Sequence, residues 1–242
     1  MKRIIIYLLC FITTIYVLNS TPTTHVWAPS CDVQPYKVFH ITADYYVPIS
    51  KNNNGSFSAP VINSGLTVGV LPFEKFQAEV GFDHIAGYGS SDEYPFYFNF
   101  KFGIPEDGFG KLFPQLAIGM YSIGTKPDLT DYNISYAKVA KTISPLGKIS
   151  LGVYVGNEKL LLDENGNVDN KGILFAVERT ITEITDKLWV CFEYQSGKNS
   201  YGTTNFGFSY KFSNNTSMLF GLNFYNNSMI QPTYTVQTDI DF

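Results

Sequence analysis

The chain has 242 residues, of which only 16% are charged while 16% are aromatic. So many aromatic residues exclude a disordered chain, and a mean hydropathy of −0.02 excludes a protein made of membrane-spanning helices. A net charge of −4 provides no general basic surface, so we expect no nucleic-acid partner. Near-neutral hydropathy with many aromatic residues favours a sheet with one apolar and one polar face.

The first twenty residues have the pattern of a secretory signal peptide. Two basic residues precede an apolar run over 4–18, and the polar Asn19 and Ser20 follow it. The run has about fifteen residues, whereas a membrane-spanning helix needs roughly twenty, so a cleaved leader over 1–20 is favoured over a transmembrane anchor. Residues 21–35 are then expected to form a periplasmic N-terminal segment.

Three cysteines are present, and one of them, Cys10, lies within the leader. Export permits a disulfide between the other two, Cys31 and Cys191. The sequence leaves open whether they pair.

Beyond residue 35 the chain alternates apolar and polar residues in segments of about ten. Over 96–102, four phenylalanines alternate with tyrosine, asparagine and lysine, and similar alternation recurs over 149–155, 206–212 and 218–224. Because successive side chains of a strand point to opposite faces, each segment is a strand with one apolar side. Twelve strands are predicted, near 36–48, 62–71, 75–85, 94–103, 113–123, 134–143, 148–156, 171–181, 187–196, 201–212, 217–225 and 232–242.

Connections of two kinds alternate along the chain. One set is mostly short, as at 72–74, 144–147 and 213–215, whereas the other set is mostly longer and rich in Asn, Gly and Ser, as at 49–61 and 157–170. Short turns on one rim and longer polar loops on the other are typical of a transmembrane β-barrel. With an even number of strands, both ends of the barrel fall on the short-turn side.

The last predicted strand carries a further signal. Its outward residues are Tyr234, Val236, Thr238, Ile240 and the terminal aromatic Phe242. This pattern, over about nine residues, resembles the C-terminal signal of bacterial outer-membrane β-barrel proteins, which the barrel-assembly machinery recognises. The resemblance implies an all-β, antiparallel up-and-down transmembrane barrel over 36–242 in the outer membrane of a Gram-negative cell. Its expected partners are outer-membrane lipid and the assembly machinery.

The two faces of the predicted strands differ in charge. A lysine or arginine facing lipid at the midplane of a barrel costs about 2–4 kcal/mol, and the apolar face has almost no charge over its middle. Lys141 and Arg179 are exceptions, expected near the short-turn rim where their long stems can snorkel. The candidate pore-lining residues lie on the other face: His40, Asp44, Glu79, Asp83, Asn99, Lys101, Lys138, Glu178, Glu193, Lys211, Asp239 and Asp241.

Seven acids against three lysines on the inner face predict a pore that prefers cations. We therefore expect a narrow, weakly cation-preferring channel, or porin-like transporter, for small polar solutes. One alternative is a plugged structural or adhesive barrel in which these charges pair with one another. Another is a soluble exported β-sandwich or lipocalin-like binding protein, with buried phenylalanines and solvent-facing charges.

Catalytic and cofactor-binding motifs are missing from the sequence. It contains no G-x-S-x-G motif, P-loop or dinucleotide fingerprint, and no His/Cys cluster with metal-ligand spacing. We expect no enzyme activity, no cofactor and no metal site.

Overall fold

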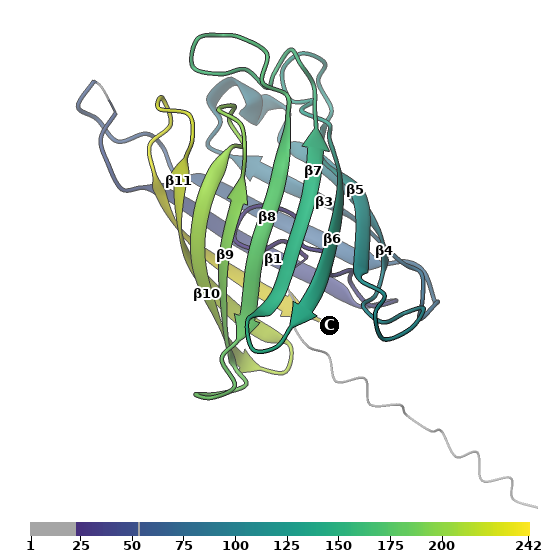
Figure 1. Ribbon diagram of the computed structural model, residues 1–242. Helices are drawn as coiled ribbons and strands as arrows, with labels where there is room; N and C mark the ends of the chain where they lie inside the picture. The colour runs from purple at the N-terminus through teal and green to yellow at the C-terminus, as the bar shows by residue number, and fades with distance from the viewer. Residues whose placement is uncertain (1–22, 53) are drawn as a thin grey trace, which may run out of the picture.

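The computed structural model describes residues 23–52 and 54–242, and its strands form one closed antiparallel barrel (Figure 1). Each strand pairs with its neighbour in sequence, and β1 pairs with β12 to close the sheet. The predicted twelve-strand, up-and-down barrel is confirmed. The strands are β1 (Phe39–Pro48), β2 (Val61–Gly69), β3 (Gln77–Ala86), β4 (Phe96–Ile104), β5 (Gln115–Gly124), β6 (Ile134–Ile143), β7 (Gly147–Val155), β8 (Lys171–Thr180), β9 (Leu188–Gln195), β10 (Thr203–Ser213), β11 (Thr216–Tyr225) and β12 (Thr233–Asp241).

The apolar side of each strand faces outward. The four phenylalanines of β4 are between 36% and 49% exposed, whereas Tyr97 and Lys101 of the same strand are 1% and 3% exposed. Neighbouring strands bring outward rings together, as in the stacked pair Phe208 and Phe220, whose centroids lie 5.4 Å apart. A β-sandwich would bury these rings between two sheets, and a lipocalin-like barrel would turn them into its interior. The closed sheet and its outward rings therefore exclude both forms of that alternative.

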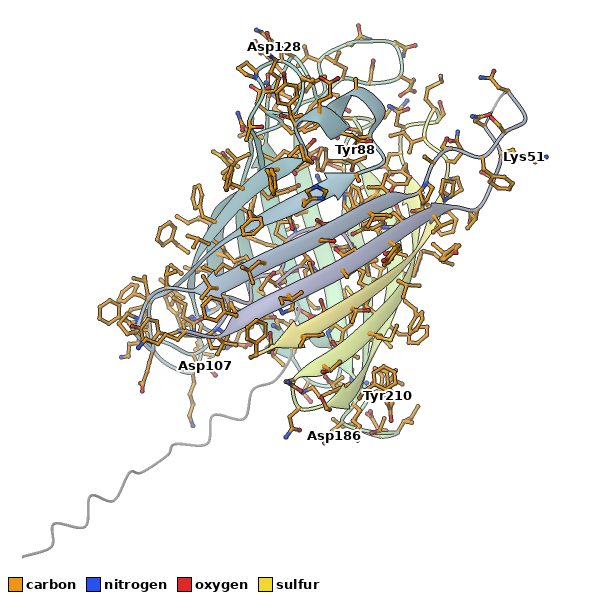
Figure 2. The ribbon with its side chains drawn as sticks, turned by 180° about the vertical axis from the view of Figure 1, so that it is seen from behind. Lys51, Tyr88, Asp107, Asp128, Asp186 and Tyr210 are labelled. Atoms are coloured by element: carbon orange, nitrogen blue, oxygen red, sulfur yellow. The ribbon has the colours of Figure 1, made fainter. Side chains whose placement is uncertain are left out.

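The two rims of the barrel differ as the sequence predicts. Figure 2 shows Lys51, Tyr88 and Asp128 at one rim and Asp107, Asp186 and Tyr210 at the other. The long-loop rim consists of the connections 49–60, 87–95, 125–133, 156–170, 196–202 and 226–232. The connections 70–76, 105–114, 144–146, 181–187 and 214–215 make up the short-turn rim. The β3–β4 loop contains the single-turn 3₁₀ helix η1 (Gly89–Glu93).

Lys141 and Arg179 both lie at the short-turn rim, as predicted. The Lys141 ammonium lies 2.9 Å from Glu106 and 2.7 Å from Asp107, both in the β4–β5 turn. Arg179 forms an ion pair with Glu183 in the β8–β9 turn. Both cations therefore meet carboxylates beyond the apolar belt.

The segment before β1 differs from the sequence-based expectation. Residues 23–35, which we call the lumen strap, run inside the ring of strands rather than outside it, and Figure 1 shows them in purple. Within the strap, His25, Val26, Ala28 and Cys31 are buried and contact the inner wall. The expected periplasmic position of 21–35 is therefore corrected for residues 23–35. The predicted leader, 1–20, lies outside the described residues.

No helix in the described part of the chain is both long and apolar enough to cross a membrane.

The β7–β8 loop fills one side of the barrel at the long-loop rim. It turns Leu161 inward, where this side chain is fully buried among Ile134, Tyr154 and Leu174. The lumen beside β6, β7 and β8 is thus occupied by apolar side chains, and the open space lies on the opposite side.

Candidate functional site in the barrel lumen

The predicted pore-lining residues all project from the inner face of the wall. Nine are buried: His40, Asp44, Glu79, Lys101, Lys138, Glu178, Glu193, Asp239 and Asp241. Asp83, Asn99 and Lys211 are partly buried. The alternation of the strands places them on this face, and seven of them line the hollow that remains in the lumen. The strap occupies much of the rest of the lumen.

One buried cluster fixes the first half of the strap. His25 is fully buried, with Nε2 lying 3.3 Å from Oε1 of Glu178 and Nδ1 lying 3.5 Å from Oε2 of Glu193. The Lys138 ammonium lies 3.3 Å from Nδ1 of His25 and donates to the carbonyl of Pro29 at 3.0 Å. Carboxylates from β8 and β9 and a lysine from β6 therefore surround one strap histidine.

A second cluster holds the other half of the strap against β3 and β4. Lys101 donates to the carbonyl oxygens of Thr23 and Asp32 at 2.7 and 2.6 Å, and its ammonium lies 3.1 Å from Glu79. The backbone N–H of Gln34 donates to Glu79 at 2.6 Å. Because these groups bond to one another, the strap closes the short-turn end of the lumen on this side.

His40 completes the closure at this end. Its ring nitrogens lie 3.3 Å from Asp239 and 2.8 Å from Asp241 on β12. The side-chain amide of Gln34 donates to Asp241 at 3.0 Å. Strap and wall therefore share one hydrogen-bonded floor.

Glycines on the inner wall make space for the strap. A Cβ at Gly69 would lie 2.1 Å from the carbonyl oxygen of Pro35. At Gly207 or Gly221 a Cβ would lie 2.6 or 2.7 Å from a methyl carbon of Val26. These close approaches show that the wall is shaped to receive this particular segment.

Sequence reasoning missed the contribution of the strap residues His25, Asp32 and Gln34. The strap forms no strand of the barrel and has no alternating pattern, so periodicity carries no signal for it. Its short apolar run, Val26 to Ala28, is the one local indication that the segment is buried.

The structure answers whether the two cysteines pair. Cys31 in the strap and Cys191 on β9 are both buried, and neither forms a disulfide.

A chamber remains between the strap and strands β1 to β6 and β12. Its volume is about 150 Å³, and its polar lining includes Asp44, Asp83 and Asp239. It adjoins a second hollow among the long loops, and the two share Trp27, Tyr46, Val61, Tyr88 and Tyr201. The chamber therefore leads toward the long-loop rim, where Figure 2 labels Tyr88, and the strap floor closes it below.

Neutral side chains hold the two carboxylates at the centre of the chamber. Asp44 accepts hydrogen bonds from Thr42 at 2.5 Å and from the amide of Asn63 at 3.1 Å. Asp83 accepts from the amides of Asn63 and Asn99 at 3.3 and 2.9 Å. Asn63 thus bridges the two carboxylates, one from β1 and one from β3.

Comparison with known proteins gives a likeness at the level of structure. No family model matches the chain, and no curated protein matches it by sequence. The KdgM porin superposes with a TM-score of 0.57 at 10% identity, over 84% of this chain and 99% of that one. The COG4313 outer membrane channel from Pseudomonas putida F1 gives 0.51 at 10% identity, over 90% and 100%.

The NanC porin gives a TM-score of 0.50 at 10% identity, over 84% of this chain and 98% of the porin. Identities this low carry the fold alone. Together with the outward aromatic rows and the closed sheet, these likenesses show that the chain has the fold of the outer-membrane porin-type β-barrels.

Proposed function

We propose that this chain is a narrow outer-membrane channel for small polar solutes, with a preference for cations, and that the lumen strap must shift before solutes pass. The observation that carries the proposal is the acidic chamber, which leads to the long-loop rim and ends on the strap. A lumen that existed only for strength would have no reason to keep a polar hollow with unpaired carboxylates. The likeness to porins and channels supports the same reading.

Membrane placement follows from the faces of the barrel. The outward rows of phenylalanine suit acyl chains, and the closed sheet leaves no unpaired edge in lipid. The long-loop rim is assigned to the cell exterior and the short-turn rim to the periplasm. Export through the leader 1–20 and recognition of residues 234–242 by the assembly machinery belong to this proposal.

The cation preference rests on the charges nearest the chamber. Asp44, Asp83 and Asp239 line it together with His40 and Lys101. His40 is engaged by Asp239 and Asp241, and Lys101 by Glu79 and strap carbonyl groups. Such a lining raises the local concentration of cations over anions. One of the structures similar to this chain is described as the KdgM porin in complex with disordered oligogalacturonate, an anionic sugar chain, so the solute class proposed here differs from that one.

A plugged structural barrel is the second candidate, because six predicted lumen residues bond to the strap. These are Glu79, Lys101, Lys138, Glu178, Glu193 and Asp241. If the strap never leaves, the barrel conducts nothing.

Planar-bilayer conductance decides between the two candidates. We expect small single-channel steps that are weakly selective for cations, and Asp44→Asn with Asp83→Asn should reduce that selectivity. Silence of the full chain under all voltages and salts would favour the plugged barrel.

A reversible crosslink tests the role of the strap. In a Cys31→Ser, Cys191→Ser background, Val26→Cys with Gly207→Cys would join strap to wall, since these positions are in close contact. We expect oxidation to abolish conductance and reduction to restore it, while Val26→Cys alone should not respond. Equal conductance in both redox states would show that the strap does not gate the channel.

A further inference from the structure

Charge is distributed unevenly along the lumen. Toward the short-turn end, every buried or half-buried carboxylate lies within 3.5 Å of a lysine or histidine nitrogen. The pairs are Glu79 with Lys101, Asp32 with Lys148, Glu178 with Lys148 and His25, Glu193 with His25, and Asp239 and Asp241 with His40. Each carboxylate in this half of the lumen therefore has a basic partner.

The central carboxylates of the chamber lack such partners. Asp44 is only 6% exposed, and neither it nor Asp83 has a Lys, Arg or His within ion-pair distance among residues 23–52 and 54–242. Their hydrogen bonds come from a threonine and two asparagines, which carry no charge. A buried and a partly buried carboxylate without a basic partner call for a positive ligand.

The polar lining also offers an acceptor that the protein does not use. Oδ1 of Asn63 is buried from water and has no hydrogen-bond partner, although the amide nitrogen of the same side chain bridges Asp44 and Asp83. Buried polar atoms without partners are rare and point to a missing group. A donor bound beside the two carboxylates would satisfy it.

Aromatic rings form the part of the chamber toward the long-loop rim. Trp27, Tyr46, Tyr88 and Tyr201 line it, and the Trp27 ring centroid lies 5.3 Å from that of Tyr46 and 6.0 Å from that of Tyr201. Aromatic faces attract organic cations through the ring quadrupole. Carboxylates below and rings above are the two halves of an ammonium-binding site.

The size of the chamber and the arrangement of its polar groups narrow the class of ligand further. A cavity of about 150 Å³ in another protein holds benzene, so the chamber suits a ligand with about six non-hydrogen atoms. Within the described part of the chain, no three His, Cys, Asp or Glu side chains are grouped so that they could hold a metal ion. The amide hydrogens of Asn63 between the carboxylates also suit a separate organic donor better than a shared metal.

We propose that the chamber binds a small organic ammonium ion, with Asp44 and Asp83 compensating its charge, Oδ1 of Asn63 accepting one of its N–H groups, and the Trp27 and tyrosine rings enclosing its carbon chain. This names the solute class of the proposed channel. It depends on that function for transport but not for binding.

Fluorescence of Trp27 provides the test on the full chain in detergent. The chain has two tryptophans, so Trp189→Phe leaves Trp27 as the single reporter. Butylammonium is the probe, and 1-butanol is its neutral counterpart of equal size. We expect a saturable change of Trp27 fluorescence with butylammonium. 1-Butanol should produce the same change only at concentrations at least tenfold higher.

Charge-removing variants assign the site. Asp83→Asn should weaken butylammonium binding at least tenfold, whereas Asp128→Asn, which removes an equal charge on the exposed β5–β6 loop, should leave it unchanged. Heat-modifiable gel migration confirms that each variant is folded. Any of four results would overturn the proposal. These are binding of 1-butanol or glucose as tight as that of butylammonium, binding of Mg²⁺ in place of the amine, no saturable response, and an unchanged affinity for butylammonium in Asp83→Asn.

The two proposals can fail separately. Saturable binding with silent bilayers would refute the channel and leave the site, whereas conductance without butylammonium binding would refute the site and leave the channel.

Discussion

Ion pairs and hydrogen bonds between single side chains hold the strap to the barrel wall. His25 stands between two carboxylates and a lysine, and none of the four groups reaches bulk water easily. A buried pair gains little over an apolar core, but loss of one partner leaves an uncompensated charge. Strap position therefore depends on a few side chains.

Lys138→Met tests this dependence. The substitution removes the donor to Pro29 and the ammonium beside His25, so that only His25 and, 3.5 Å from Glu178, Lys148 remain to compensate Glu178 and Glu193. Breaking a buried pair costs roughly 3–5 kcal/mol, and here we expect the cost to appear as release of the strap. Limited proteolysis should then cleave residues 23–35 in the variant while the barrel stays intact. Lys159→Met, which removes an exposed ion pair with Asp128 between two long loops, is the control, and equal protection in both variants would contradict the prediction.

Among the elements, the β4–β5 turn clasps a neighbouring strand. Glu106 accepts hydrogen bonds from the backbone N–H of Thr142 at 2.9 Å and from its hydroxyl at 2.6 Å, beside Lys141. Burial opposes ionisation of this carboxyl, but the hydrogen bonds from Thr142 and the Lys141 ammonium outweigh it and hold the pKa of Glu106 below its ordinary value of 4.5. Its ionised form is therefore the one that fastens the turn.

The lowered pKa of Glu106 fixes the direction in which the stability of this turn changes with pH. Because the pKa of Glu106 is lowered in the folded protein, its stabilisation is complete above pH 4.5 and is lost as the pH falls through the lowered pKa. We expect the Thr142 amide to lose protection from hydrogen exchange below pH 4.5, after correction for intrinsic rates. Glu106→Gln should lack this transition. Ala140, further along β6, serves as the internal control, and the same profile in wild type and variant would refute the clasp.

For the molecule as a whole, the apolar outward face of the barrel determines that it must be surrounded by lipid. Rows of phenylalanine on β4, β10 and β11 are exposed on a single closed sheet, and the strand cations on this face, Lys141, Lys171 and Arg179, lie near the strand ends. Such a surface requires hydrocarbon around it, since exposed apolar areas this large drive association in water.

Phe208→Lys tests the placement in lipid. Phe208 lies at the middle of β10, and a lysine at the midplane of a barrel destabilises the membrane-inserted state by about 2–4 kcal/mol. Phe212→Lys, near the short-turn rim, should cost about 0–1 kcal/mol. Urea titration of folding into lipid vesicles measures both, and equal costs would show that residue 208 does not face the membrane interior.

Much of the fold could be predicted because a strand repeats every two residues. Phe96 to Phe102 and Phe206 to Phe212 identify both the strand and its outward side, and Lys101 is then assigned to the lumen without further information. The same alternation placed Lys141 on the outward face, and its position near the end of its strand placed it at the short-turn rim. Turn lengths supplied the two rims and, with the even strand count, the rim at which the first strand begins and the last strand ends.

The chamber could not be predicted in the same way. Asp44 and Asp83 are recognisable as inward residues, but their lack of cationic partners depends on where Lys101, Lys138 and Lys148 reach, and those lysines bond to the strap or to its partners. Chain separation hides these contacts, since Lys138 and Pro29 are 109 residues apart.

The sequence by itself therefore determined a twelve-stranded barrel, its outward face and the residues of its inner wall, because the period-two pattern is a local property of each strand. Only the tertiary structure decided that residues 23–35 fill the lumen, which carboxylates are paired and which face open space. That segment has no periodicity, and its place depends on contacts with a wall that exists only after all twelve strands have closed.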